Sequence, residues 1–114
     1  MSETSFEIAK VSIILKLLGD RTRLKMMKLM EDHTFCVCEF VEIFQASQPA
    51  ISQHLRKLKD LGLIIEERKG QWIFYSINKR HESYPLIEPI LDQLPSQNDK
   101  LKVLEEKGTR MTWC

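Results

Sequence analysis

The chain has 114 residues, of which 43% are hydrophobic and 29% charged, which predicts one globular domain that needs neither a metal ion nor a disulfide to fold. The longest uncharged apolar run near the N-terminus, residues 11–15, cannot span a bilayer. Glu3 and Glu7 stand where a secretory signal is basic, so we expect a cytoplasmic protein without a membrane partner. The net charge is only +1, but residues 46–80 hold seven basic and three acidic side chains, as a phosphate-facing surface requires.

The first predicted helix covers residues 6–18. One of its faces carries five apolar side chains, Ile8, Val11, Ile14, Leu15 and Leu18. Ile13 and Leu17 lie outside that face, so the second half of the helix is apolar nearly all round. A monomer does not leave such a surface in water. We therefore expect a second subunit to cover it.

Two shorter helices follow. Gly19 breaks the first helix, and Asp20 is suited to cap a second one over residues 21–31. Its inward stripe consists of Leu24, Met27 and Met30. A third helix is expected at about residues 37–44, with Phe40, Val41 and Phe44 facing inward.

A fourth helix and a hairpin come next. Ser47 caps the helix, Pro49 lies in its first turn, and it runs to Leu61 and ends at Gly62. Residues 63–68 and 72–77 are rich in β-branched and aromatic side chains and predict the two strands of a β-hairpin. The expected turn is Lys69-Gly70-Gln71, in which Gly70 supplies the positive φ.

The pattern after the hairpin is again helical. Pro85 opens this helix and Pro95 ends it. Its apolar stripe consists of Leu86, Ile87, Ile90, Leu91 and Leu94. We expect a mainly α fold with a β-hairpin wing (α+β), a winged helix-turn-helix over residues 1–95 that dimerises through its N-terminal and post-wing helices. Residues 96–114 form an extension of uncertain structure, with a short helix expected at 101–106.

The fourth helix has a polar face that suits DNA. Ile51, Leu55 and Leu58 point inward, so Pro49, Ser52, Gln53 and Arg56 point outward. An amide such as that of Gln53 can read an adenine edge, and Arg56 or Lys57 can hold phosphate or guanine. Arg68 and Lys69 at the hairpin tip would reach the flanking backbone. The predicted DNA-contacting residues are Ser47, Gln48, Pro49, Ser52, Gln53, His54, Arg56, Lys57, Arg68, Lys69 and Gln71.

Five segments taken in order resemble the ArsR/SmtB family: LLGDRTRL (17–24), CVCEF (36–40), SQPAISQHL (47–55), LGLI (61–64) and GQWIFYSI (70–77). The resemblance covers roughly residues 6–95. Members of this family are dimeric winged-helix repressors of bacterial metal-resistance operons that leave DNA when a metal ion binds. The resemblance implies a dimer interface built from the N-terminal and post-wing helices, and a DNA surface that includes Gln48, Ser52, Gln53 and His54.

The same resemblance draws attention to two cysteines. Arsenic- and cadmium-type members bind the metal through a Cys-Val-Cys-Asp-Leu-Cys segment at the start of the third helix. Cys36 and Cys38 match its first two thiols, and Val41 stands at the third. Residues i and i+2 of an ideal helix point about 200° apart, so we expect the first turn to unwind before both thiols reach one ion. The alternative is that both cysteines are small apolar residues at a helix start.

Thiolates are soft ligands, which favours a thiophilic inducer such as arsenic(III) or antimony(III). His33 and Cys114 are the candidate third ligands, and an exogenous ligand is the alternative for arsenic(III). No cofactor is required for DNA binding.

We therefore expect a homodimeric repressor that binds double-stranded operator DNA and releases it when such an ion binds Cys36 and Cys38. The alternative is a repressor of the same fold that responds to thiol oxidation or lacks metal sensing. An enzyme is not expected, because no catalytic triad, phosphate loop or paired-carboxylate pocket is identifiable. The basic middle third of the chain disfavours a winged helix used only for protein contacts.

Overall fold

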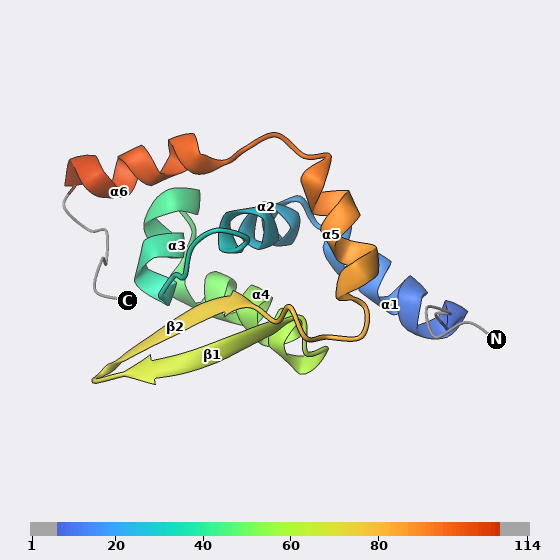
Figure 1. The fold of residues 1–114 in the computed structure, drawn as a ribbon. Helices are drawn as coiled ribbons and strands as arrows, with labels where there is room; N and C mark the ends of the chain where they lie inside the picture. Colours follow the sequence, from blue (N-terminus) through green and yellow to red (C-terminus); the bar gives the residue numbers. More distant parts are fainter. Residues whose placement is uncertain (1–6, 108–114) are drawn as a thin grey trace.

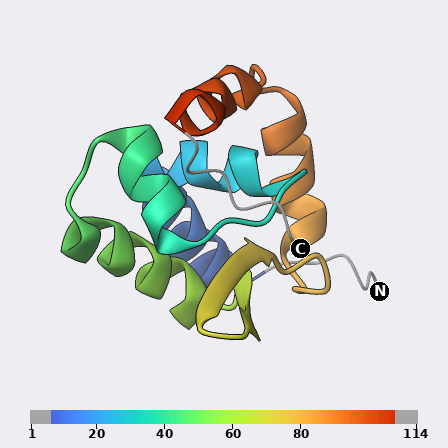
Figure 2. The same cartoon turned by 90° about the vertical axis from the view of Figure 1, so that its left-hand side faces the viewer.

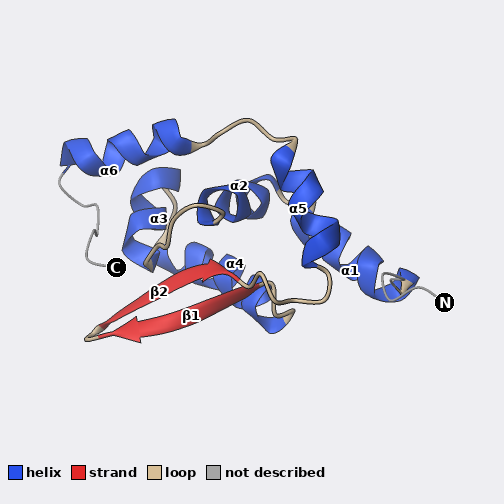
Figure 3. Cartoon of the chain, in the orientation of Figure 1, coloured by secondary structure: helices blue, strands red, loops and turns tan. Residues whose placement is uncertain are grey.

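The computed structural model describes residues 7–107 and folds them into a helical body from which a β-hairpin projects (Figures 1 and 3). The hairpin is the wing of a winged helix-turn-helix, and the fold is mainly helical with one antiparallel sheet, as predicted. The elements in chain order are α1 Ile8–Leu18, α2 Arg21–Met30, α3 Val37–Phe44, α4 Gln48–Asp60, β1 Ile64–Lys69, β2 Trp72–Ile77, α5 Tyr84–Asp92, the short 3-10 helix η1 Asn98–Lys100 and α6 Leu101–Lys107.

The helix starts follow the capping residues in the sequence. Asp20 caps α2, because its Oδ1 accepts a hydrogen bond of 3.0 Å from the Arg23 N–H. Ser47 caps α4, because its hydroxyl oxygen accepts a hydrogen bond of 3.3 Å from the Ala50 N–H. Gly62, with φ of 75°, ends the turn after α4, where an L side chain would be strained.

The first strand of the hairpin lies one residue later than predicted, whereas the second strand has the predicted bounds, residues 72–77. β1 and β2 are antiparallel, with Ile64 opposite Ile77 and Lys69 opposite Trp72. Lys69 is therefore the last strand residue rather than part of the turn. The tight loop is Gly70-Gln71, and Gly70 has the positive φ, 64°, that a two-residue hairpin loop requires.

The core lies where α1, α2, α4 and α5 meet the base of the hairpin. Apolar side chains of every helix contribute, and Phe35 and Phe40 stack at 4.8 Å between their ring centroids. Helix α6 lies over α3 in both views (Figures 1 and 2) and buries Leu104 completely. Residues 101–107 are thus packed on the helical body, while the division at residue 95 stays a prediction.

Two helices differ in detail from the sequence prediction. Ile8 and Leu15 were expected to share the inward face of α1, but their exposed fractions are 87% and 47%. Only Ile14 and Leu18 of that helix are buried. Helix α5 ends at Asp92 rather than at Pro95, whereas Pro89 lies within the helix, as its place within the range of the apolar stripe predicts. No helix within residues 7–107 is long and apolar enough to cross a membrane.

Candidate nucleic-acid interface and thiol site

Helix α4 presents the polar face that its sequence indicates. Ile51, Leu55 and Leu58 are buried. Pro49, Ser52, Gln53 and Arg56 line a hollow of about 240 Å³ on the opposite side. An amide, a hydroxyl and a guanidinium thus share one outward face, which is the chemistry needed to read base edges.

The other predicted DNA-contacting residues lie around this face. Gln48 donates a 3.2 Å hydrogen bond from Nε2 to the Ser52 hydroxyl, which fixes the two side chains relative to each other. Exposed positions are Ser47, Lys57, Arg68 and Gln71, whereas His54 and Lys69 are half-buried. Lys59 pairs with Glu66 at 2.6 Å and thereby joins the recognition helix to the wing.

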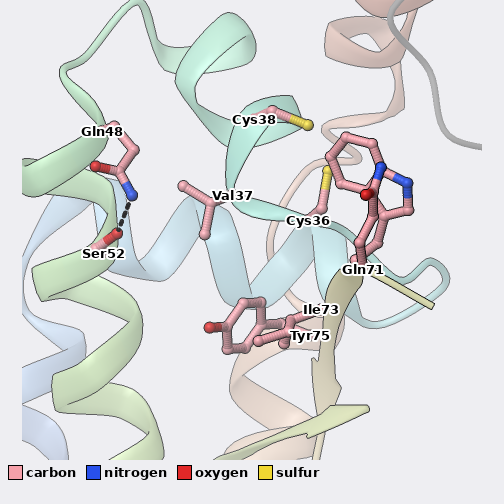
Figure 4. Close-up of a pocket in the computed structure, with 9 residues that line it drawn as sticks. Cys36, Val37, Cys38, Gln48, Ser52, Gln71, Ile73 and Tyr75 are labelled. Carbon is pink, nitrogen blue, oxygen red and sulfur yellow. Dashed lines mark hydrogen bonds between the residues drawn. The ribbon is translucent and has the colours of Figure 1, made fainter. Parts of the chain in front are cut away.

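The thiols of Cys36 and Cys38 do not lie on one ideal helix. Cys36 is the N-cap of α3 and has extended backbone angles, φ −95° and ψ 167°, while Cys38 lies in the first turn. The expectation that a helical turn must unwind before both thiols reach one ion is therefore wrong, because Cys36 precedes the helix. Figure 4 shows the two sulfur atoms facing a common space.

The environments of the two thiols differ. Cys36 is buried and Cys38 exposed. Burial, and next a hydrogen bond with Cys38, raise the pKa of the Cys36 thiol to about 12. The buried Glu39 completes a capping box, because its Oε1 accepts a 2.9 Å hydrogen bond from the Cys36 N–H. Cys36 is thus held in place by the first turn of α3 and carries a proton at neutral pH.

One recess joins the thiols to the DNA-reading elements (Figure 4). Its volume is about 460 Å³, and its walls come from the start of α3, the start of α4 and strand β2 with its turn. The lining residues are Cys36, Val37, Cys38, Gln48, Ser52, Gln71, Trp72, Ile73 and Tyr75. Three predicted DNA contacts, Gln48, Ser52 and Gln71, therefore share a recess with the predicted sensor.

The sequence did not reveal a backbone connection between the segment that carries the two thiols and the wing. The Phe35 N–H donates to the Tyr75 carbonyl at 3.1 Å, and the Tyr75 N–H donates to the Phe35 carbonyl at 2.7 Å. Phe35 directly precedes Cys36, so the segment that carries the thiols is bonded to β2. A single bridge of this kind leaves no periodicity in the sequence.

Among residues 7–107, the structure brings the two thiols together without a third protein ligand. Within residues 7–107, no three His, Cys, Asp or Glu side chains gather closely enough to hold a metal ion. His33 instead packs edge-on against Phe35, 6.1 Å between ring centroids. Cys114, the other candidate, lies outside the described residues. Val41, which stands at the family's third thiol position, is half-buried beside the core.

Comparison with known proteins places these features in a family. Residues 20–66 match the family described as bacterial regulatory protein, arsR family. The arsenical resistance operon repressor of Bacillus subtilis is 40% identical over 80 residues, which are 68% of this chain and 76% of that protein. The arsenic resistance transcriptional regulator ArsR1 of Pseudomonas putida is 40% identical over 73 residues, 63% of this chain but only 57% of that protein.

A solved structure has the same fold. Reduced HlyU from Vibrio cholerae superposes with a TM-score of 0.63 at 30% identity, over 72% of this chain and 85% of that one. The relatives are regulators and repressors of transcription, not enzymes. The chain belongs to the ArsR family of bacterial transcriptional regulators.

Proposed function

We propose that this protein is a homodimeric transcriptional repressor that binds operator DNA through α4 and the wing. It leaves the operator when a thiophilic ion, arsenic(III) or antimony(III), binds Cys36 and Cys38. The observation that carries the proposal is the shared recess, in which both thiols meet Gln48 and Ser52 of α4 and Gln71 of the wing. A regulator of this kind works where the chromosome is, in the cytoplasm.

The DNA contacts divide by chemistry. Gln53 and Arg56 project from the outward face of α4 and would read base edges in the major groove. Lys57 and Arg68 are exposed and would contact the sugar-phosphate backbone on either side. The N-terminus of α4, capped by Ser47, adds a partial positive charge for a phosphate.

Exposed apolar side chains on α1 support the dimer. Ile8, Ile13 and Leu15 are 87%, 53% and 47% exposed. Ile13 lies on one flank of the buried side of α1, and Ile8 and Leu15 lie on the other, and exposed apolar side chains of this kind mark a protein contact. A second copy placing its own α1 there would bury them, and a two-fold dimer would present two recognition helices to a dyad-symmetric operator.

The thiol pair suits arsenic(III). Arsenous acid condenses with two thiols, forming two S–As bonds and releasing two waters, with one hydroxyl left on arsenic. This reaction consumes protonated thiols, so the raised pKa of Cys36 does not oppose it. A divalent cation such as Cd²⁺ needs thiolates and must displace the Cys36 proton. The absence of a third protein ligand within residues 7–107 fits an exogenous third group.

The contacts around the pair provide a route from ion to DNA. Drawing Sγ of Cys36 and Sγ of Cys38 onto one ion changes the start of α3. That start is bonded to β2 through Phe35 and Tyr75, and α3 packs on α4. A shift at the thiols therefore moves the wing relative to the recognition helix. DNA binding depends on the distance between these two elements.

The test is operator binding by the reduced protein, with the operator selected from random DNA. Arsenite and antimonite should each lower affinity, zinc should not, and cadmium should act less than arsenite. Cys36→Ser and Cys38→Ser should bind the operator as the wild type does but remain bound when arsenite is added. The Cys114→Ser variant tests whether the C-terminal cysteine serves as the third ligand, because its loss would then weaken the response to arsenite. Release of the Cys36→Ser/Cys38→Ser double variant by arsenite would place the sensor elsewhere.

Thiol oxidation is a second candidate, favoured by the hydrogen bond between Cys36 and Cys38 and by the likeness to a protein studied as reduced HlyU. A peroxide would take two electrons and two protons from the pair and form the S–S bond, releasing two waters from hydrogen peroxide or one water and one alcohol from an alkyl hydroperoxide. Peroxide-driven release that dithiothreitol reverses, with no response to arsenite, would support this candidate instead.

A further inference from the structure

Arg23 connects two helices that otherwise have separate tasks. Its Nε donates a 2.7 Å hydrogen bond to the Leu17 carbonyl in the last turn of α1. Its Nη1 lies 3.0 Å from Nδ1 of His54 on the recognition helix. Its own N–H is held by Asp20 at 3.0 Å. One half-buried guanidinium thus bridges the end of α1 and the middle of α4.

The contact with His54 has a defined protonation state. A guanidinium can only donate, so Nδ1 of His54 must accept and the imidazole is neutral with its proton on Nε2. Burial lowers the pKa of His54, Asp20 raises it, and Arg23 and Lys57 lower it. The charged groups around the ring are therefore one carboxylate and two cations, and the neutral form required for the contact is favoured.

We propose that Arg23 is a positioning residue for DNA binding, because it clamps His54 to the end of α1 and so fixes the angle at which α4 meets the proposed dimer helix. In a two-fold dimer, that angle sets the distance between the two recognition helices and hence the half-site spacing that the protein accepts. The inference rests on the proposed function, but the clamp itself is a property of one chain.

The first test compares two arginines of the same helix. Arg23→Gln removes the clamp, and Arg21→Gln removes an equal charge from an exposed position of α2 without touching α4. Each variant is titrated on the selected operator and on copies with the spacer changed by one base pair. Arg23→Gln should bind the preferred spacing roughly tenfold more weakly, the worth of a hydrogen bond to a charged group. Its discrimination between spacings should shrink while its salt dependence stays unchanged, and Arg21→Gln should behave as wild type.

The second test uses pH, to which a merely structural residue would not respond. Protonated His54 cannot accept a hydrogen bond from Arg23, so the wild-type protein should lose its discrimination between spacings when His54 takes up a proton. Because the pKa of His54 is lowered from the ordinary histidine value of 6.5, this loss should occur below pH 6.5. His54→Asn keeps an acceptor near the Nδ1 position and does not titrate, so the discrimination that this variant shows at pH 7, whatever its affinity for DNA, should not fall in acid. His54→Leu should resemble Arg23→Gln at every pH.

Nitrogen NMR of the DNA-free protein separates this inference from the proposed function. The His54 ring should show an unprotonated Nδ1 and a protonated Nε2 at pH 7, and Arg23→Gln should abolish that preference and raise the pKa of His54. The proposed role of Arg23 would be wrong if a folded Arg23→Gln variant discriminated between spacings as strongly as the wild type does. It would also be wrong if His54 carried its proton on Nδ1. Failure of the wild type to bind any DNA, with the NMR result intact, would overturn only the proposed function.

Discussion

Cys36 and Cys38 are two positions apart and chemically unlike. Cys36 is 3% exposed, caps α3, and has a thiol pKa raised to about 12 by burial and by its neighbour. Cys38 is exposed in the first turn. A reagent arriving from solvent therefore meets Cys38 first.

Alkylation should reveal this order. Because the thiolate is the nucleophile, iodoacetamide at pH 7.5 should label Cys38 well before Cys36 in the folded protein. Mass spectrometry with fragmentation distinguishes the two positions. In urea both should react alike, which serves as the control. Equal labelling rates in the folded protein would mean that Cys36 is neither buried nor protonated as described.

Substitutions of Gln53 and Arg68 should distinguish contacts that read base edges from contacts that hold the DNA backbone. Gln53→Ala removes an amide from the outward face of α4 and should cost about 1–3 kcal/mol on the selected operator but little on random DNA. Arg68→Ala on the wing should weaken both DNAs similarly and reduce the salt slope. Fluorescence anisotropy at several salt concentrations measures both. An equal loss on the two DNAs for Gln53→Ala would remove it from the base readers.

At the scale of elements, the sequence was informative where structure is local. Asp20 and Ser47 cap their helices and Gly70 forms the hairpin turn, as their residue types predict, because each role depends only on neighbours a few residues away in the sequence. The Phe35–Tyr75 bridge and the Arg23–His54 contact join residues 40 and 31 positions apart. Such contacts depend on how helices pack, and no spacing in the sequence records them. The packing of α6 on α3 is of the same kind.

Helix α6 should stabilise the domain through one side chain. Leu104→Ala removes a fully buried group between α6 and α3 and should lower the free energy of unfolding by about 2–5 kcal/mol. Lys102→Ala, at an exposed position of the same helix, should change it by less than about 0.5 kcal/mol. Urea denaturation followed by circular dichroism gives both values. Two equal, small effects would show that α6 does not pack on α3 in solution.

At the scale of the whole molecule, α1 is too apolar on its outer side for an isolated chain. Ile13→Glu replaces one of the exposed apolar side chains of α1 by a charged one and should shift the protein to a monomer at micromolar concentration. Asn98→Glu, exposed in η1, should leave the dimer intact. Sedimentation velocity measures the mass. A wild-type monomer that still binds a dyad-symmetric operator tightly would contradict the dimer.

The central claim is that binding of the ion and binding of the operator weaken each other. The most direct test is to measure the affinity for the ion with and without operator DNA. The arsenite affinity of the reduced protein is titrated twice, once free and once saturated with operator DNA. The proposed coupling predicts that DNA weakens arsenite binding about 5- to 150-fold, the same factor by which arsenite weakens DNA binding. The double variant Cys36→Ser/Cys38→Ser should bind arsenite in neither state. Equal wild-type affinities with and without operator would contradict the account.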